Sequence, residues 1–261
     1  MGKTITIAFA NNKGGSGKTT SCANVGYSLW SMGKKVLLID GDMQMNLSLS
    51  YFDEDQVLSF ATGGHNLYTA ILKQDDLKDY IQNTDYPGLD LIPSSTLMSE
   101  IEYKLYSMDG SQTILKDCLA KVKKSGKYDF ILIDAPPTLG GWVNNILAAA
   151  DNVIVPVEAS PWGLFGLANM LEFVDNAGRT NHKLKLLGIA ITKVDMRKNY
   201  FKQTSETLAE ADVPVFKTVI RIDREVEWAQ DDSKPILAYK KNARSALEYL
   251  EMSREVLELC Q

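Results

Sequence analysis

Short runs of almost wholly apolar residues recur along the chain, and segments with helical periodicity separate them. Strands buried on both faces of a parallel sheet have such continuous runs, and parallel strands need helical crossovers between them. The pattern therefore predicts an α/β protein with one doubly wound, mostly parallel sheet flanked by helices. The predicted strands cover residues 5–10, 35–40, 89–93, 128–134, 152–157, 184–192 and 213–220.

The periodic segments between these runs predict the helices. Residues 51–64 lack periodicity and contain Gly63-Gly64, so this segment is predicted to be a loop. Since no Pro-rich or Ser-rich linker divides the chain, we expect residues 1–261 to form a single domain. The predicted helices cover residues 19–30, 67–72, 77–81, 96–108, 112–124, 164–176, 200–210 and 242–259.

A loop rich in glycine and lysine joins the first predicted strand to the first predicted helix. It reads Asn11-Asn-Lys-Gly-Gly-Ser-Gly-Lys-Thr-Thr20. Strand, glycine-rich loop and helix form the context of a phosphate-binding loop, in which backbone N–H groups turn inward around an anion. Lys18 is expected to reach the β- and γ-phosphates, and the Thr19 hydroxyl is expected to bind Mg²⁺.

This loop departs from the usual pattern at two positions. The residue five before Gly17 is normally glycine and is Asn12 here, and Lys13 adds a second lysine inside the loop. The residues expected to bind the nucleotide are Lys13, Gly14, Gly15, Ser16, Gly17, Lys18, Thr19 and Thr20.

Three aspartates follow or end buried strands. Asp134 ends a hydrophobic strand, as the Mg²⁺-binding aspartate of phosphate-loop enzymes does. Asp40 ends another strand, and Asp42 follows two residues later. Because open α/β sheets place ligand chemistry at the carboxyl ends of their strands, we expect these carboxylates to serve a metal ion and a water molecule there.

Composition narrows the class of protein. Hydrophobic residues make up 45% of the chain and charged residues 23%, as in ordinary globular proteins. Three cysteines, an odd number, argue against a disulfide framework. The glycine-rich loop begins at residue 11, which leaves no room for a signal peptide, and no apolar run approaches the length of a membrane span. We therefore expect a cytoplasmic protein.

The charge is unevenly distributed. The net charge is −5, which argues against a dedicated nucleic-acid-binding protein. Residues 179–244, however, hold 14 Lys and Arg against 9 Asp and Glu. This asymmetry indicates either a basic face in the C-terminal third or an ordinary mixed surface.

Three motifs together resemble the deviant-Walker ATPases, and within them the ParA/Soj group, which partitions plasmids and chromosomes. They are Lys13-Gly-Gly-Ser-Gly-Lys-Thr-Thr20, Leu38-Ile-Asp-Gly-Asp-Met-Gln-Met-Asn46 and Ile131-Leu-Ile-Asp-Ala-Pro-Pro137. Shorter matches at Thr192-Lys-Val-Asp-Met-Arg197 and Lys234-Pro-Ile-Leu237 extend the resemblance over nearly the whole chain.

The resemblance implies an ATPase that uses ATP and Mg²⁺ and forms a sandwich homodimer in the ATP state. Lys13 would cross to the nucleotide of the partner subunit, and Asp42 would position the attacking water. The dimer would bind DNA without sequence preference and associate with the nucleoid, and a ParB-like centromere-binding partner would stimulate slow hydrolysis. Lys13, Lys18 and Asp42 are thus the expected catalytic residues, and Thr19, Asp40 and Asp134 the expected metal ligands.

Base and DNA contacts are placed by the same resemblance. Arg221 and Asp223 match the positions near the adenine, although the family usually has Pro and Asn there. Met43 and Met45 likewise replace the usual Pro and Gly. The expected DNA-binding residues are Arg197, Lys198, Arg224 and Lys241.

Two other functions share these motifs. A MinD-like positioning ATPase would end in a basic amphipathic membrane helix, whereas the last predicted helix here carries Glu248, Glu251, Glu255 and Glu258. We therefore expect no membrane partner. A nucleotide-gated adaptor with negligible turnover is the second alternative, since a sequence does not set a hydrolysis rate.

Overall fold

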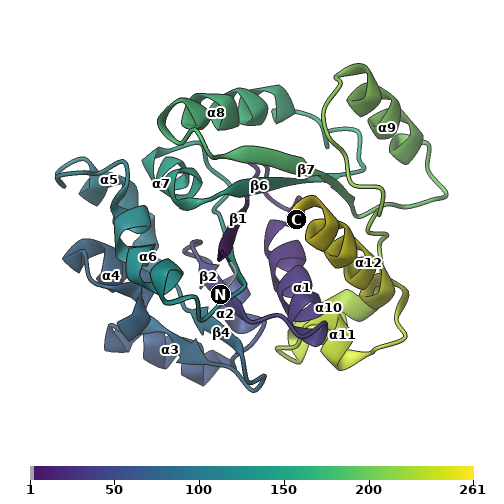
Figure 1. Cartoon of the computed structure of the whole chain (residues 1–261). Helices are drawn as coiled ribbons and strands as arrows, with labels where there is room; N and C mark the ends of the chain where they lie inside the picture. Colours follow the sequence, from purple (N-terminus) through teal and green to yellow (C-terminus); the bar gives the residue numbers. More distant parts are fainter. Residues whose placement is uncertain (1–2) are drawn as a thin grey trace.

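A seven-stranded sheet runs through the centre of the computed structural model, which describes residues 3–261 (Figure 1). The strand order is β3-β4-β2-β5-β1-β6-β7, and every neighbouring pair is parallel except β3 and β4. The predicted doubly wound, mostly parallel sheet is confirmed. The strands are β1 (Ile5–Phe9), β2 (Val36–Asp40), β3 (Gln82–Asn83), β4 (Leu89–Ile92), β5 (Phe130–Asp134), β6 (Asn152–Glu158) and β7 (Lys185–Thr192).

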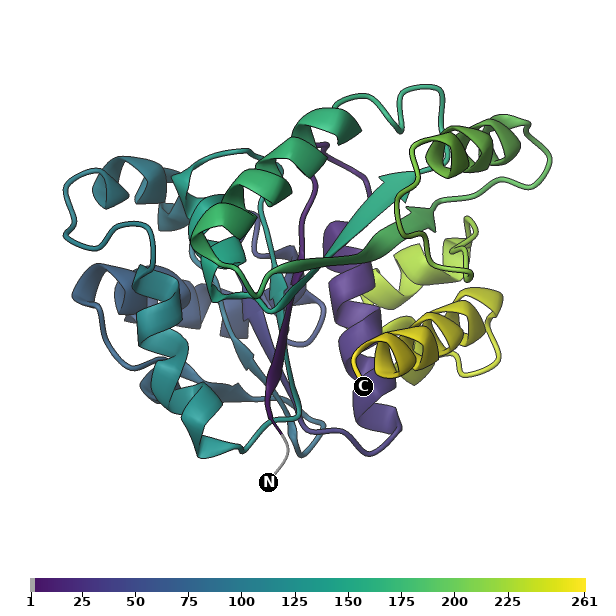
Figure 2. The ribbon, with the colours of Figure 1, turned by 45° about the horizontal axis from the view of Figure 1, so that its top comes forward.

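Helices cover both faces of this sheet (Figures 1 and 2). Successive strand residues point to opposite faces, so Ile131 and Ile133 join one hydrophobic cluster while Phe130 and Leu132 join the other. The first cluster is covered by α4 (Leu67–Lys73), α5 (Ile101–Leu105), α6 (Ile114–Ser125), α7 (Gly141–Ala149), α8 (Leu167–Thr180), α9 (Tyr200–Glu210) and the 3₁₀ helices Leu77–Tyr80 and Thr96–Glu100. The second is covered by α1 (Lys18–Ser31), α2 (Asn46–Leu49), α3 (Glu54–Gly63), α10 (Arg224–Asp231), α11 (Ile236–Tyr239) and α12 (Arg244–Leu259).

The segment predicted as a loop at residues 51–64 contains helix α3, so that prediction is wrong. Asp53 caps the helix by accepting a hydrogen bond from the Gln56 N–H at 2.8 Å, and the Gln56 side chain accepts one from the Asp53 N–H at 3.1 Å. This reciprocal capping box is legible in the sequence as Asp-x-x-Gln. The two glycines at the end, which suggested a loop, form the C-terminus of the helix.

Asp53→Ala is expected to lower the free energy of unfolding by about 1 kcal/mol, because it leaves the orphaned N–H groups of α3 without their side-chain acceptor. Urea unfolding followed by circular dichroism measures the loss. Asp55→Ala is the matched control, since Asp55 lies in the same first turn without capping the helix. Equal losses in the two variants would contradict the capping role.

The predicted strand at residues 213–220 is also wrong, because it contains a single isolated bridge, Val215 with Ile189, and the next bridge, Arg221 with Val194, lies just beyond it. Between them, the N–H groups of Lys217 and Thr218 donate to the Glu255 carboxylate on α12 at 2.8 and 2.7 Å instead of to β7. The segment therefore follows the edge of β7 as extended chain without a regular ladder.

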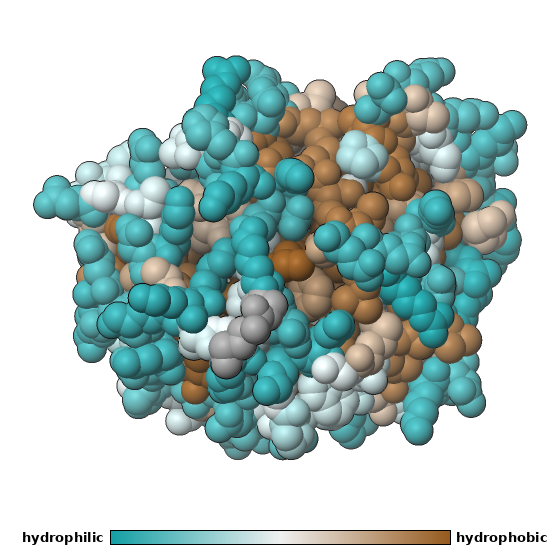
Figure 3. All heavy atoms as spheres, viewed as in Figure 1, coloured by the Kyte–Doolittle hydropathy of each residue, from teal (hydrophilic) through white to brown (hydrophobic). Residues whose placement is uncertain are grey.

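This edge of the sheet is only partly covered. Figure 3 shows apolar side chains gathered over β7 and the adjoining parts of α8 and α9. A cavity of about 350 Å³ opens between α9 and the 213–220 segment, and its lining includes Phe201, Val215 and Val219.

The helix predicted at residues 96–108 is shorter than expected, because a 3₁₀ turn precedes α5.

Candidate nucleotide-binding site

The glycine-rich loop joins the carboxyl end of β1 to helix α1 at the centre of the sheet edge. Gly15 and Gly17 have φ angles of +73° and +87°, which non-glycine residues rarely adopt. A Cβ on Gly17 would also lie 3.3 Å from the Thr192 hydroxyl at the end of β7. The loop therefore needs glycine at these positions. It leads directly into the N-terminus of the 14-residue helix α1, which favours an anion at this end of the strands.

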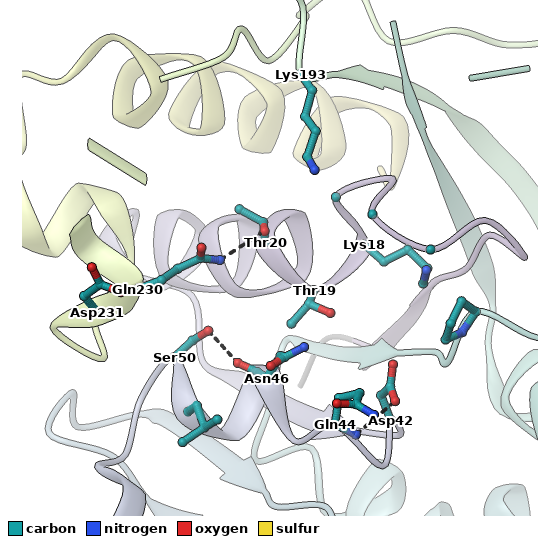
Figure 4. A pocket seen from close by; sticks show the side chains of 15 residues that line it. Lys18, Thr19, Thr20, Asp42, Gln44, Asn46, Ser50, Lys193, Gln230 and Asp231 are labelled. Carbon is teal, nitrogen blue, oxygen red and sulfur yellow. Dashed lines mark hydrogen bonds between the residues drawn. The ribbon is translucent and has the colours of Figure 1, made fainter. Parts of the chain in front are cut away.

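A cavity of about 490 Å³ opens beside this loop (Figure 4). Residues from five distant parts of the chain surround it: the glycine loop with α1, the segment after β2, Pro137 after β5, Lys193 after β7 and the end of α10. Its lining includes Gly14, Gly15, Gly17, Lys18, Thr19, Thr20, Asp42, Gln44, Asn46, Lys193, Gln230 and Asp231.

Lys18 supplies a buried cation at the cavity. Its side chain is only slightly exposed, and its amine donates to the Lys13 carbonyl oxygen at 3.1 Å. Burial lowers the pKa of Lys18, while the carboxylates of Asp134 and Asp42 act in the opposite direction. An anion in the cavity would compensate the desolvation of this amine.

Thr19 lines the cavity, and the Asp134 carboxylate lies behind it. The Thr19 hydroxyl donates to Asp134 Oδ2 at 2.6 Å. Asp134 is fully buried, and its Oδ1 has no hydrogen-bond partner within residues 3–261. Burial and the neighbouring Asp40 raise the pKa of Asp134 well above its usual value. A hydroxyl and a carboxylate with an unsatisfied oxygen are the hard oxygen donors that Mg²⁺ prefers, so these residues fit a magnesium ion.

Asp40 is paired in register with Asp134 across β2 and β5, but its oxygens are occupied by local contacts. Oδ2 accepts from the Ser48 N–H at 2.8 Å and the Ser48 hydroxyl at 2.7 Å, and Oδ1 accepts from the Asp42 N–H at 3.2 Å. Burial raises the pKa of Asp40 to about 6. Through these contacts Asp40 fixes the turn that carries Asp42.

Asp42 faces the cavity from this turn (Figure 4). Its Oδ1 accepts from the Gln44 N–H at 3.1 Å. The turn is held from behind as well, because the Trp142 indole N–H donates to the Gly41 carbonyl oxygen at 2.9 Å. Asp42 therefore has a fixed position next to Lys18 and the glycine loop, with its carboxylate directed into the cavity.

Lys13 points elsewhere. Its amine lies 3.3 Å from Glu158 Oε2 and 3.4 Å from the Ser160 hydroxyl at the end of β6. The Lys13 and Glu158 side chains are 26% and 30% exposed. Within one subunit the first lysine of the loop is thus paired with Glu158 outside the cavity lining, whereas Lys18 lines the cavity.

A second cavity of about 340 Å³ adjoins the first. Arg221 and Asp223, the residues predicted to lie near the adenine, are among its lining residues. Both also have structural contacts: Arg221 pairs with Glu248 on α12, and Asp223 caps α10 and accepts from the Ser245 hydroxyl at 3.0 Å. The two cavities share Gly17, Thr20, Lys193 and Gln230.

Sequence reasoning did not identify Lys193 or Gln230. The Gln230 amide donates to the Thr20 hydroxyl at 3.2 Å (Figure 4). Helix α10, which carries Gln230, was not among the predicted helices, so nothing in the sequence pattern pointed to this residue. Lys193 directly follows a predicted strand. Because the aspartates were singled out for lying at strand ends, the same signal could have identified Lys193.

The expected DNA-binding residues lie on neighbouring segments. Backbone contacts join Val194 to Ile220 and Ile222 at 3.0 Å each, so the segment after β7 runs beside the segment leading into α10. Lys240 pairs with Glu225, which brings the 240–244 segment alongside. Arg197 is paired with Asp195 at 2.8 Å, whereas Lys198, Arg224 and Lys241 are exposed and form no ion pair within residues 3–261.

A strand–glycine loop–helix unit with Lys18, Thr19 and a strand-end aspartate at one sheet edge defines the class of phosphate-loop nucleotide-binding proteins. The chain belongs to the ParA/Soj family of deviant-Walker ATPases within this class. The matching family model is described as an AAA domain and covers residues 4–186.

Two curated relatives match almost from end to end. The chain is 32% identical to the chromosome partitioning protein ParA of Caulobacter vibrioides (strain NA1000 / CB15N), over 96% of this chain and 93% of the relative. It is 34% identical to the sporulation initiation inhibitor protein Soj of Bacillus subtilis (strain 168), over 98% of both.

Two solved structures are similar. Cobyrinic acid a,c-diamide synthase from Mycobacterium smegmatis, with bound ATP analogue and magnesium, superposes with a TM-score of 0.82 at 29% identity over 98% of this chain and 95% of that one. A putative plasmid partition protein from Borrelia burgdorferi B31, bound to AMPPNP, gives 0.80 at 26% identity over 98% and 99%.

Proposed function

We propose that this chain is a DNA-partitioning ATPase acting as one domain, in which Mg²⁺-ATP drives a homodimer that binds DNA without sequence preference. A ParB-like centromere-binding partner stimulates slow hydrolysis and resets the cycle. The protein works in the cytoplasm and associates with the nucleoid in its ATP state. The observation that carries this proposal is the different placement of the two loop lysines: Lys18 lines the cavity, whereas Lys13 lies outside the lining and pairs with Glu158.

The cavity supports ATP as the substrate. Backbone N–H groups of the glycine loop, the positive end of α1 and Lys18 together favour the phosphates. Thr19 and Asp134 are the residues that would hold the magnesium ion, which neutralises charge on the phosphates when bound. The B. burgdorferi relative with AMPPNP and the M. smegmatis relative with ATP analogue and magnesium support this assignment.

Asp42 is the proposed catalytic carboxylate. It faces the same cavity as Lys18, and Asp40 and Trp142 hold its turn in place. Asp42 would orient the attacking water and accept its proton. Asp40 acts on this step only by positioning Asp42.

Lys13 is the proposed link between nucleotide and dimer. Its pair with Glu158 is partly exposed, and such pairs contribute about 0–1 kcal/mol. This contact is weak enough to be exchanged for one with a triphosphate, where charge-assisted hydrogen bonds contribute roughly 1.5–3 kcal/mol each. A second subunit facing the cavity would place its own Lys13 within reach of the γ-phosphate.

The membrane-positioning alternative is not favoured by α12. Its buried side, which includes Tyr249, Met252 and Val256, joins the hydrophobic cluster that α1 shares. Its exposed residues include Glu251 and Glu258, which anionic lipids would repel. None of the helices within residues 3–261 combines the length and hydropathy needed to cross a bilayer.

DNA retention tests the proposal. A non-specific duplex is expected to retain the protein with Mg²⁺-ATP and release it with ADP, and Arg224→Ala is expected to reduce retention severalfold. Each phosphate contact contributes roughly 0.9 to the slope of log affinity against log salt, so loss from both subunits should reduce that slope by about 2.

Lys73→Ala is the matched control, since Lys73 is exposed on α4 against the opposite face of the sheet. It should leave both retention and salt slope unchanged. Retention of the wild-type protein that does not depend on the nucleotide would contradict the proposed gating. A phosphate-release rate that neither DNA nor partner raises above a blank would argue for the adaptor instead.

A further inference from the structure

Within residues 3–261, Lys193 is the one cation that lies at both cavities of the site, and the quoted motif that contains it, Thr192–Arg197, gives it no role. It directly follows β7, and its side chain extends from the strand end toward the glycine loop (Figure 4). Its ammonium nitrogen lies 4.0 Å from the position that a Cβ would take on Gly15. The amine is thus placed over the middle of the phosphate-binding turn.

The base of Lys193 is fixed to that turn. The hydroxyl of the preceding residue, Thr192, donates to the Ser16 carbonyl oxygen at 2.8 Å and lies 3.3 Å from the Val157 carbonyl oxygen. Thr192 is almost fully buried. These contacts tie the end of β7, and therefore the backbone from which Lys193 extends, to the loop.

The backbone of Lys193 is strained. Its φ is +52°, and five non-glycine residues within residues 3–261 have a positive φ. Gln74, Asp212 and Ser233 do so at or just beyond the C-termini of α4, α9 and α10, where the left-handed conformation is ordinary. Lys193 and Met45 end no helix, and both lie on segments that border the nucleotide-binding site. Backbone strain that is retained beside a ligand-binding site indicates that the position of the strained residue serves function.

The Lys193 amine is also available. Lys18 donates to the Lys13 carbonyl and Lys13 pairs with Glu158, but no carboxylate within residues 3–261 pairs with Lys193. Its position between the phosphate cavity and the cavity lined by Arg221 and Asp223 is where a nucleotide would pass from its phosphates to its nucleoside.

We propose that Lys193 is a nucleotide-binding residue whose amine contacts the phosphates that ATP and ADP share, at the junction of the two cavities. The inference rests on the proposed function, since it presumes that this site binds adenine nucleotides. It separates two roles among the lysines at the site: Lys193 supports binding of both nucleotides, whereas Lys13 responds to ATP alone.

Calorimetric titration with Mg²⁺-ADP, and with Mg²⁺-ATP in an Asp42→Ala background, tests the assignment. Lys193→Ala is expected to weaken the binding of both nucleotides by about tenfold, which corresponds to the loss of one charge-assisted contact. Lys193→Met, which keeps the apolar stem, should lose as much, and Lys193→Arg should stay within about threefold of the parent. Unchanged affinities in Lys193→Ala, full affinity in Lys193→Met, or a loss confined to ATP would overturn the assignment.

Lys193→Gly separates binding from folding. Glycine relieves the positive φ, so the thermal midpoint should rise while the affinity for both nucleotides falls. If the thermal midpoint and the nucleotide affinity both fell, Lys193 would be a purely structural residue, and the proposal would be overturned. A parent protein that binds neither nucleotide would overturn the proposed function itself, whereas a binding parent with unaffected Lys193 variants would overturn only the role of Lys193.

Discussion

Asp42→Ala is expected to reduce the rate of ATP hydrolysis by at least about a hundredfold while ATP binding persists. Loss of a positioned general base costs roughly 10²–10⁴ in rate, and Asp42 is the carboxylate that the Asp40 and Trp142 contacts hold toward Lys18 and the glycine loop. Binding should survive, because the glycine loop and Lys18 supply the phosphate contacts. Phosphate release under steady-state conditions, together with a nucleotide titration, measures both quantities.

Asp231→Ala is the matched control, because Asp231 lines the same cavity from the end of α10, away from the segment that holds Asp42. It should keep a near-normal rate. Hydrolysis at the parental rate in Asp42→Ala would exclude Asp42 as the residue that activates water.

Lys13→Gln is expected to abolish the ATP-dependent dimer and to leave nucleotide binding by the single subunit nearly intact. Two symmetric Lys13 contacts, at roughly 1.5–3 kcal/mol each, contribute about 3–6 kcal/mol, which corresponds to a 10²–10⁴-fold change in the dimerisation constant. A shift from mostly monomer to mostly dimer needs about 5.5 kcal/mol of differential binding, so losing these contacts removes most of the driving force.

Sedimentation of Lys13→Gln with Mg²⁺-ATP measures this loss. Lys35→Gln is the control, since Lys35 is an exposed lysine just before β2, at the opposite edge of the sheet. It should dimerise as the parent does. An ATP-dependent dimer of normal stability in Lys13→Gln would show that the Lys13 contact with Glu158 is merely structural.

The strands of the sheet could be predicted because the signal for each strand lies within its own few residues. Strands buried on both faces leave continuous apolar runs, and the runs at residues 35–40 and 128–134 end on the two aspartates that the structure pairs in register. The order of the strands then places their carboxyl ends beside the glycine loop. The sequence motifs thus located the edge at which the cavity opens.

Other features depend on contacts that a sequence does not display. The segment 213–220 has the composition of a strand, yet Glu255, far along the chain, takes the N–H groups that a ladder would need. Asp40 was expected to bind a metal ion, but the folding of α2 behind it directs Ser48 onto its carboxylate. Lys193 and Gln230 reach the site only through the packing of β7 and α10 around the loop. In contrast, α3 was missed although its capping box was legible.

The mass in solution of the Asp42→Ala variant with Mg²⁺-ATP tests the central claim most directly, because this variant holds ATP without consuming it. Twice the mass of one subunit is expected with ATP, and the mass of one subunit with ADP or without nucleotide. A single ATP-bound subunit at concentrations where the parent protein binds DNA would contradict the proposed exchange of Lys13 from Glu158 to a partner's triphosphate.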